Sequence, residues 1–361
     1  MNRSPGRQEV ALNSGFFNRL RFNPARLRWK ALLLNLALSF ATFLLCVAAL
    51  EVLLRFNGYG KLEIYEPDPL LYWKLKPNQD CYTKIDLRPV HINSLGTRGP
   101  EFDPAKPPRT IRVLSLGDSR TFGWGLRESE TYSDRLQQYL QEELGTTQRV
   151  EVINAGVNAW SYSQMLVYFR DIALKYSPDI VIVGEANLWT QFSEHNSPEF
   201  VKKFMFRVRL KNFLRRFAIY HYFIEIKLKA YYERYRIKFI PVDPSRDTLF
   251  VEQQQADPDA VFRSALHDIV NLAKTNHVQP VLLYLPTEDQ LTTTNTTGDR
   301  VLRVKGDLSR GHGVPLVDIS PDVRAETNSV YLEGDPVHFN ARGNEIIARQ
   351  LLRTLLPLVN R

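Results

Sequence analysis

Residues 31–54 form the run ALLLNLALSFATFLLCVAALEVLL, the strongest apolar signal in the chain. A helix of about 24 residues rises about 36 Å, which exceeds the hydrocarbon thickness of about 30 Å, so the run can cross a bilayer with some tilt. Asn35 and Glu51 lie near its ends, where polar side chains can reach the interface. A signal peptide has a shorter apolar region that ends in small residues, and soluble cores seldom hold so long a run. We therefore expect a transmembrane helix.

The tail that precedes this run is strongly basic. Residues 1–30 hold seven Lys or Arg and a single acid, Glu9. Basic residues that flank a membrane span favour the cytoplasmic side. We expect residues 1–30 to form a cytoplasmic tail, residues 31–54 to span the membrane once, and the chain from residue 55 onward to be extracytoplasmic, in the periplasm or outside the cell.

The formal net charge of +8 is concentrated in two segments. The tail is one, and residues 200–239 are the other, with twelve Lys or Arg and two Glu. Without these two segments the chain carries a net charge of −8. A nucleic-acid-binding domain is usually basic over a whole face, so we expect no nucleic-acid partner. Cys46 lies in the apolar run, which makes a disulfide with Cys81 implausible.

Beyond the apolar run the chain changes character twice. Residues 55–110 are rich in Pro, Tyr and polar turns and predict a strand-and-loop linker that packs on the following domain. From residue 111 short apolar runs alternate with helical patterns. Strands are expected at 111–116, 149–154, 179–184, 280–286 and 314–319, and helices at 131–144, 162–176, from 257, at 299–309 and at 341–356. This alternation predicts an α/β domain over 111–361 with a five-stranded parallel sheet covered on both faces.

Sites in such sheets form where the strands end, and Ser119 follows the first strand in GDS. A serine becomes nucleophilic only beside a base that is itself oriented by an acid. His338 has Asp335 three residues before it in DPVH, and Asp318 at another strand end is a rival acid. The alternative is that Ser119 is an ordinary turn residue and that His338 caps the final helix. No histidine pair has metal-ligand spacing such as H-E-x-x-H, so we expect neither metal nor cofactor.

Four blocks, GDSRTFGWG, NAGVNAWS, GEAN and DPVH, resemble in order and spacing those of the SGNH (GDSL-type) hydrolases over residues 111–356. That family has a flavodoxin-like, three-layer α/β fold and contains serine esterases and acyltransferases. The resemblance implies a Ser119 nucleophile with Asp335 and His338 completing the triad. It also implies an oxyanion hole made by the N–H groups of Ser119 and Gly156 and the Asn187 side chain.

The sequence differs from the family pattern at one position, and two further features resemble one group of family members. Leu188 stands where many relatives have an aspartate after the third-block asparagine, which weakens the expected support of Asn187. The phrase GTRGPEF and the anchor resemble the membrane-anchored bacterial-type members. We therefore expect a membrane-anchored serine esterase that cleaves O-acyl esters, acetyl above all, on an extracytoplasmic glycan or lipid. The alternatives are an O-acyltransferase for a cell-surface polysaccharide and a non-catalytic binding protein with the same fold.

An insert at about 190–256 interrupts the domain after the third strand. Within it, residues 200–238 combine aromatic and aliphatic residues at helical spacing with charges that are almost all positive, among them Lys211, Arg215 and Arg216. This pattern predicts an amphipathic helix. Two interpretations remain open for it: a helical pair packed on the domain, or a surface that also rests on anionic lipid or gathers an anionic glycan.

Overall fold

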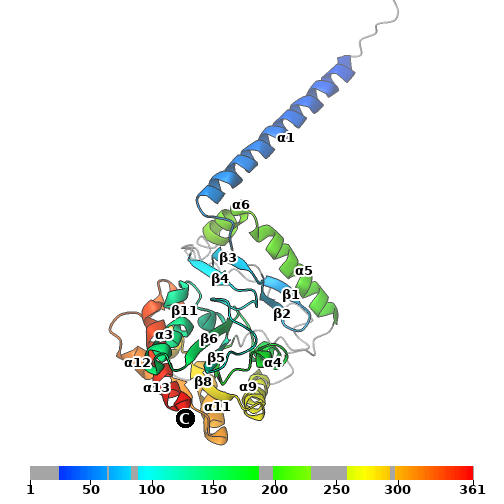
Figure 1. Ribbon diagram of the computed structural model, residues 1–361. Coiled ribbons are helices and arrows are strands. Elements are labelled where there is room, and N and C mark those ends of the chain that lie inside the picture. Colours follow the sequence, from blue (N-terminus) through cyan, green and yellow to red (C-terminus); the bar gives the residue numbers. More distant parts are fainter. Residues whose placement is uncertain are drawn as a thin grey trace, which may run out of the picture. The chain divides into compact units, whose positions relative to one another are not determined.

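The computed structural model describes residues 24–62, 65–82, 88–186, 198–228, 258–292 and 297–360 (Figure 1). Two compact units divide the chain, Met1–Leu53 and Leu54–Arg361. The described part of the first unit belongs to helix α1, Pro24–Phe56. Its stretch Arg28–Phe56 has a mean hydropathy of 2.3 in its most apolar window and is long enough to cross a membrane. All that follows concerns the second unit.

A five-stranded parallel sheet forms the centre of the second unit. Its strands are β5 (Thr110–Gly117), β6 (Arg149–Gly156), β7 (Ile180–Val183), β8 (Gln279–Tyr284) and β9 (Leu316–Asp318). They lie in the order β6-β5-β7-β8-β9. Numbered along the chain this is 2-1-3-4-5, the flavodoxin-like order, so the expected fold is confirmed. Gly117 lies opposite Gly156, and therefore β5 and β6 end at the same level.

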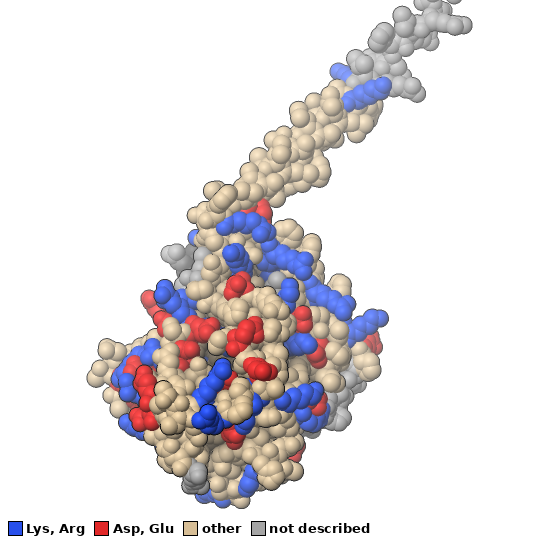
Figure 2. Space-filling view, in the orientation of Figure 1, with Lys and Arg blue, Asp and Glu red and all other residues tan. Residues whose placement is uncertain are grey.

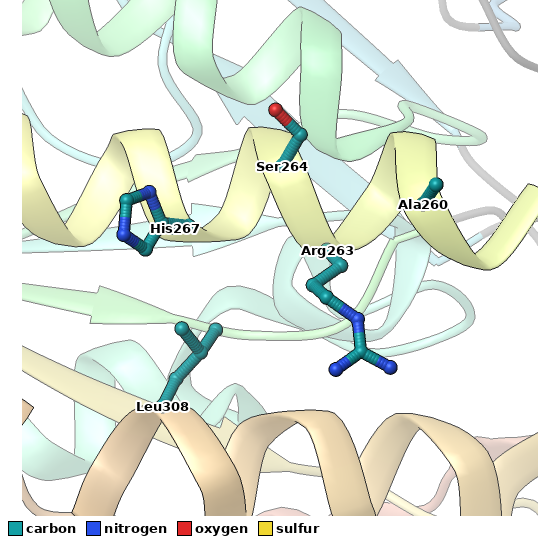
Figure 3. Close-up of a pocket in the computed structure, with 5 residues that line it drawn as sticks. All are labelled: Ala260, Arg263, Ser264, His267 and Leu308. Atoms are coloured by element: carbon teal, nitrogen blue, oxygen red, sulfur yellow. The ribbon is translucent and has the colours of Figure 1, made fainter. Parts of the chain in front are cut away.

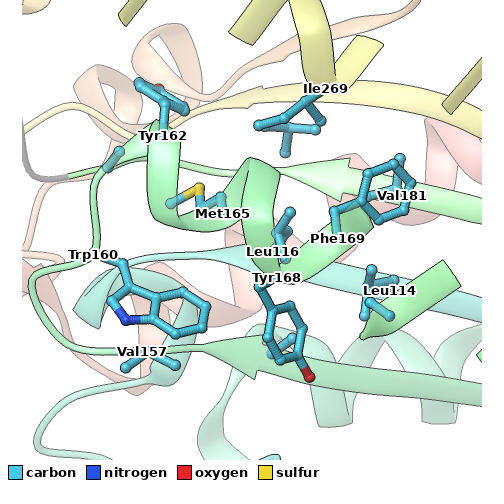
Figure 4. Packing of buried hydrophobic residues seen from close by; sticks show 14 of the residues in the cluster. Leu114, Leu116, Val157, Trp160, Tyr162, Met165, Tyr168, Phe169, Val181 and Ile269 are labelled. Atoms are coloured by element: carbon cyan, nitrogen blue, oxygen red, sulfur yellow. The ribbon is translucent and has the colours of Figure 1, made fainter. Parts of the chain in front are cut away.

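Helices cover both faces of the sheet, which makes three layers (Figure 1). Along β5, Val113 enters one apolar core, whereas Leu114 and Leu116 enter the other. Alternate side chains of a strand point to opposite faces, which explains this division. The first core is shared with α3 (Tyr132–Leu144) and α13 (Ala341–Val359), and the second with α4 (Tyr162–Asp171), α9 (Pro258–Thr275) and α11 (Thr297–His312). Figure 4 shows α4 side chains packed against β5 in the second core.

The expected helix over 162–176 is two elements. Helix α4 ends at Asp171, and the 3-10 turn η2 (Ala173–Tyr176) follows. Ile172 separates them with a φ of −122°, outside the helical region. The remaining short elements are α2 (Ser119–Phe122), η1 (Glu128–Glu130), α10 (Glu288–Thr292), α12 (Ser320–Ala325), β10 (Tyr331–Leu332) and β11 (Asp335–Phe339).

The segment before the sheet folds into short antiparallel pairs that pack on the domain. β1 (Tyr65–Asp68) pairs with β2 (Tyr72–Leu75), and β3 (Gln79–Tyr82) pairs with β4 (Pro89–Ile92). The indole N–H of Trp73 donates to the carbonyl of Asn158 at 3.0 Å, and that of Trp160 donates to the carbonyl of Trp73 at 2.9 Å. These two bonds join β2 to the loop that follows β6.

The described part of the insert is helical. It comprises α5 (Pro198–Arg215), α6 (Ala218–Tyr220) and the π-helical η3 (His221–Leu228), whereas residues 187–197 and 229–257 lie outside the described residues. Helix α5 packs on β1 and β2, and its Asn212 side chain bonds both the N–H and the carbonyl of Tyr65. Arg215, expected on the basic surface, is instead buried, with its guanidinium 6.0 Å from the ring centroid of Tyr65.

Candidate active site

Ser119 is the first residue of α2, a one-turn helix that begins directly after β5. Asp118 caps this helix because its carboxylate accepts the N–H of Arg120 at 2.9 Å. At the other end the N–H of Gly123 donates to the carbonyl of Ser119 at 3.0 Å, with Gly123 in the left-handed region at a φ of 84°. The N–H of a first helical residue has no acceptor inside its own helix. Ser119 is partly exposed, so its hydroxyl can be reached from solvent.

Three glycines at neighbouring strand ends let α2 sit close against the sheet. Gly117, Gly156 and Gly184 end or follow β5, β6 and β7. A Cβ on Gly117 or Gly156 would overlap Thr121 or the backbone of Phe122, and one on Gly184 would lie 2.6 Å from Thr121 Oγ1. Only hydrogen fits at these positions. The position of the Ser119 turn is therefore set by three adjacent strands.

His338 and Asp335 reach Ser119 from the β10–β11 hairpin. His338 Nε2 lies 2.8 Å from Ser119 Oγ, and His338 Nδ1 lies 2.8 Å from Asp335 Oδ2. Because an ionised carboxylate only accepts hydrogen bonds, Nδ1 carries the ring proton and Nε2 accepts from the serine hydroxyl. Asp335 and His338 both belong to β11, and the left-handed Gly334 (φ 68°) turns the chain into this strand. The structure thus brings together the three residues that the sequence singled out.

The environment of Asp335 keeps its carboxylate ionised. Partial burial acts to raise its pKa, but the hydrogen bond and charge of His338 and the N–H groups of Val337 and His338 outweigh burial and lower the pKa to about 2. A fixed negative charge beside Nδ1 stabilises the imidazolium that forms when Nε2 takes a proton. The indole of Trp124 lies 6.2 Å from the imidazole, measured between ring centroids.

Asp318, the rival acid, has a different role. One of its carboxylate oxygens accepts both the N–H of Ser320 at 2.9 Å and the Ser320 hydroxyl at 2.6 Å. These bonds shape the turn into α12. The structure therefore identifies Asp335 as the acid beside the imidazole.

The expected oxyanion donors are placed less favourably. The N–H of Gly156 donates to Asn154 Oδ1 at 3.1 Å, so this group already has an acceptor and the expectation that it faces the oxyanion is not supported. Its lack of a side chain serves close packing against Phe122. Asn187 lies outside the described residues. In the loop after β6, Ala159 has a φ of 63°, a strained value for a residue with a Cβ.

Comparisons with known proteins find similarity to solved structures. No family model and no curated protein compared with the chain matches it. Among solved structures, a lipase/acylhydrolase from Enterococcus faecalis is 15% identical, with 69% of this chain and 96% of that one covered and a TM-score of 0.44. The psychrotrophic esterase EstA from a Pseudoalteromonas species is 13% identical, with 69% and 99% covered and a TM-score of 0.42. A mutant of an acetyl-xylooligosaccharide esterase from Geobacillus Stearmophilus is 16% identical, with 67% and 93% covered and a TM-score of 0.44.

At these identities the likeness concerns the fold alone. The strand order 2-1-3-4-5, with a serine turn after the first strand, is the arrangement that the resemblance implied. Arg98, Glu185 and Lys305 support the nucleophile turn, although the sequence assigned them no role.

Arg98, from the GTRG phrase, holds the far end of the nucleophile turn. Its guanidinium donates to the carbonyls of Phe122 at 2.7 Å, Gly123 at 2.8 Å and Leu126 at 2.7 Å. It is 3% exposed, and burial lowers its pKa to about 10. Sequence reasoning used this phrase only as a family marker. The one available signal was an arginine within a glycine-containing turn.

A buried ion pair supports the other side of the turn. Lys305 on α11 is fully buried and donates to Glu185 Oε1 at 2.6 Å, to the carbonyl of Leu283 at 2.6 Å and to that of Gly184 at 3.0 Å. Burial lowers the pKa of Lys305, while the charge of Glu185 opposes that change. The carbonyl of Glu185 in turn accepts the N–H of Asp118 at 2.9 Å. Lys305 therefore connects α11 to the residue that precedes the nucleophile.

A hollow in the described surface lies away from these residues. It has a volume of about 510 Å³ and lies between α9, which contributes Ala260, Arg263, Ser264 and His267, and α11, which contributes Leu308 (Figure 3). None of these residues belongs to the Ser119, His338 and Asp335 group. The serine in this hollow also has no hydrogen bond to His267 among the described contacts, so nucleophilic chemistry is not expected there.

Proposed function

We propose that this chain is a membrane-anchored serine esterase that removes O-acyl groups, acetyl above all, from an extracytoplasmic glycan or lipid. One observation carries the proposal: Ser119, His338 and Asp335 form a continuous hydrogen-bonded row with two contacts of 2.8 Å. A nucleophile, a base that can take its proton and an acid that orients the base are what acyl transfer through serine needs.

The reaction follows from this geometry. His338 Nε2 takes the hydroxyl proton as Ser119 Oγ bonds to the ester carbonyl carbon, and the resulting oxyanion is stabilised by N–H donors that include that of Ser119. His338 then gives the proton to the leaving alcohol oxygen as its bond to carbon breaks. Water attacks the acyl-serine with His338 again as base, which releases the carboxylic acid and restores Ser119. Asp335 stays ionised throughout because its pKa is about 2.

The anchor in this proposal rests on α1. The apolar stretch Arg28–Phe56 is near the N-terminus and has the length and composition of a span, and a basic tail precedes it. An anchored enzyme with its N-terminus in the cytoplasm has its catalytic unit on the other side of the membrane. Protease added to cells whose outer membrane, where there is one, has been opened should then degrade residues after 56 and spare the tail.

The direct test is hydrolysis of a chromogenic acetyl ester by the full chain in detergent. Ser119→Ala should abolish turnover, because the alanine variant has no nucleophile, whereas the exposed Ser129→Ala in η1 should retain it. A fluorophosphonate probe should label the native chain at Ser119, as read by peptide mass spectrometry, and should not label the Ser119→Ala variant. Wild-type turnover by Ser119→Ala would overturn the proposal.

The same assay separates the alternatives. With a sugar acceptor present, transfer of the acetyl group to the sugar at the expense of free acetate would identify an O-acyltransferase that uses the same acyl-serine. A folded chain that neither hydrolyses the ester nor reacts with the probe would be a binding protein. The intact row of three side chains argues against that last outcome.

A further inference from the structure

The outward face of α5 has a continuous apolar stripe that nothing in the described chain covers. Phe206 is 66% exposed, Leu210 49%, Phe213 55% and Phe217, just after the helix, 41%. Their spacing of four, three and four residues places them in one row along the helix. Phe213 and Phe217 contact each other edge to face, with ring centroids 5.3 Å apart. We call these four residues the α5 stripe.

The opposite face of α5 is already occupied by the domain. Phe204 packs against Trp73 of β2 with ring centroids 5.4 Å apart, and Asn212 bonds the backbone of Tyr65 in β1. The helix therefore has two apolar faces, whereas the amphipathic helix expected from the sequence has one. One apolar face is explained by packing on β1 and β2. The α5 stripe requires a second partner, because contiguous exposed apolar side chains usually mark an interaction site.

Basic residues border the α5 stripe on both sides. At 100° per residue, Lys202, Arg209 and Arg216 fall along one flank, and Lys203, Arg207 and Lys211 fall along the other. The band of Lys and Arg that follows α5 is visible in Figure 2. A row of aromatic and leucine side chains between two basic rows is the composition of helices that lie in the interface of anionic membranes.

Chain connectivity supports the same partner. Arg55 follows the apolar run 31–54 directly in the sequence, and its guanidinium donates to the carbonyl of Arg216 at 2.7 Å. Gly60 donates its N–H to His221 Nδ1 at 2.9 Å, which ties η3 to the same short segment. The carboxyl end of α5 thus lies within one hydrogen bond of the residue at which the proposed membrane span ends.

We propose that the α5 stripe inserts into the interface of an anionic lipid bilayer and that its flanking Lys and Arg bind the headgroups. This inference rests on the anchor in the proposed function and adds a second membrane contact to it. The phenyl rings and Leu210 would lie at the acyl boundary, where burial of apolar area favours binding, and the six basic side chains would meet lipid phosphates. The catalytic unit would then be held at two points.

The test uses the full chain in nanodiscs that contain anionic lipid and a lipid-borne doxyl quencher. A single cysteine at Leu210→Cys, in a background with both Cys46 and Cys81 replaced by Ser, is labelled with an environment-sensitive fluorophore, and Glu143→Cys at an exposed position of α3 in the same background is the matched control. The label at residue 210 should lose emission to the lipid quencher and resist a water-soluble quencher, whereas the label at residue 143 should behave in the opposite way. Native Cys46, labelled separately, reports whether α1 is in the bilayer.

A charge variant tests the lipid specificity. Among the described residues the side chains of Lys202, Arg209 and Arg216 take part in no hydrogen bond or ion pair, so their replacement by Gln should leave the fold intact. The variant should lose quenching at residue 210 in anionic nanodiscs, with no change at Cys46.

Three outcomes would overturn the proposal. Quenching of the label at residue 210 by the aqueous quencher, together with lipid quenching at Cys46, would show that the α5 stripe faces water although α1 is in the bilayer. Protection from both quenchers would indicate a protein or glycan partner. Absence of lipid quenching at Cys46 itself would overturn the anchor and with it this inference.

Discussion

His338 accepts from Ser119 through one ring nitrogen and donates to Asp335 through the other, and the three side chains come from two distant parts of the chain. Ser119 follows β5, whereas the other two lie more than 200 residues later on one hairpin. The pairing of Asp335 with His338 could be read from the sequence because the two residues are only three positions apart. The parallel sheet brings both residues close to Ser119. This proximity could therefore be expected only after the fold had been predicted.

The two candidate acids should differ sharply in their effect on the rate. Asp335→Asn should lower kcat by about 10⁴-fold, because an amide beside Nδ1 favours the wrong imidazole tautomer. Asp318→Asn, which only disturbs the turn into α12, should cost little activity. Turnover of the chromogenic ester by both purified variants checks this. A larger loss in Asp318→Asn would mean that the orienting acid is misassigned.

The depressed pKa of Asp335 also predicts a pH dependence of stability. Its pKa is about 2 in the folded chain and about 3.9 in an unfolded one, so ionised Asp335 stabilises the fold at neutral pH. This contribution is fully present above about pH 4 and is lost as the pH falls through about 2. The melting temperature of wild type should exceed that of Asp335→Asn near neutrality, and the gap should close between about pH 4 and pH 2. A gap that persists at the lowest pH would contradict the assignment.

At the scale of elements, α2 is too short to hold its own position. A four-residue helix has few internal hydrogen bonds, so its place is set by what surrounds it. Three glycines admit it to the sheet, Arg98 holds its carboxyl end and Asp118 caps its start. Two supports can be tested by mutation: Arg98, and Lys305, which bonds Glu185 on the other side of the turn.

Arg98→Lys should impair catalysis through α2. A lysine has no planar fork and cannot keep three hydrogen bonds to the carbonyls of Phe122, Gly123 and Leu126. Buried carbonyls without a partner cost about 1–3 kcal/mol. We expect a lower melting temperature and a fall in kcat with little change in KM. Exposed Arg324→Lys is the control, and an unchanged kcat in Arg98→Lys would make Arg98 a support of the linker only.

Lys305→Met should be strongly destabilising. It leaves the Glu185 carboxylate buried without its partner, which typically costs about 3–5 kcal/mol. Adding Glu185→Gln should restore part of the loss, because the uncompensated charge is then gone. Melting temperatures of both variants and of the exposed control Lys175→Met in η2 provide the measurement. If the double variant were less stable than Lys305→Met, the loss of stability in Lys305→Met would not come from the unpaired charge of Glu185.

At the scale of the whole molecule, the sheet and its helices were predictable and the supports of the site were not. Each of the five strands of the sheet is a short apolar run that alternates with a helical pattern, and such periodicity survives in a single sequence. The role of Arg98 depends on a hydrogen bond to the backbone carbonyl of Phe122, which is 24 residues away. Every residue has a backbone carbonyl, so the residue types do not reveal which one Arg98 contacts. Lys305 lies on α11, and its partner Glu185 is 120 residues earlier, so nothing in the local sequence connects the two residues.

The insert shows a different limit of sequence reasoning. Its helix was expected, but the assignment of Arg215 to the surface was wrong because the helix turns that residue toward Tyr65. A sequence with apolar residues on two sides of a helix does not reveal which side meets the domain. The packing of β1 and β2 on α5 decides it.

The openness of the catalytic row determines how long an acylated intermediate can survive. The His338 side chain is 17% exposed and that of Asp335 is 22% exposed. In the described part of the chain the row is thus partly open to solvent, and water can reach the acyl-serine, whereas enzymes that protect such intermediates exclude it. The acylated form of this chain should be short-lived and should partition toward free acid, with one equivalent of acetate appearing for each equivalent of alcohol.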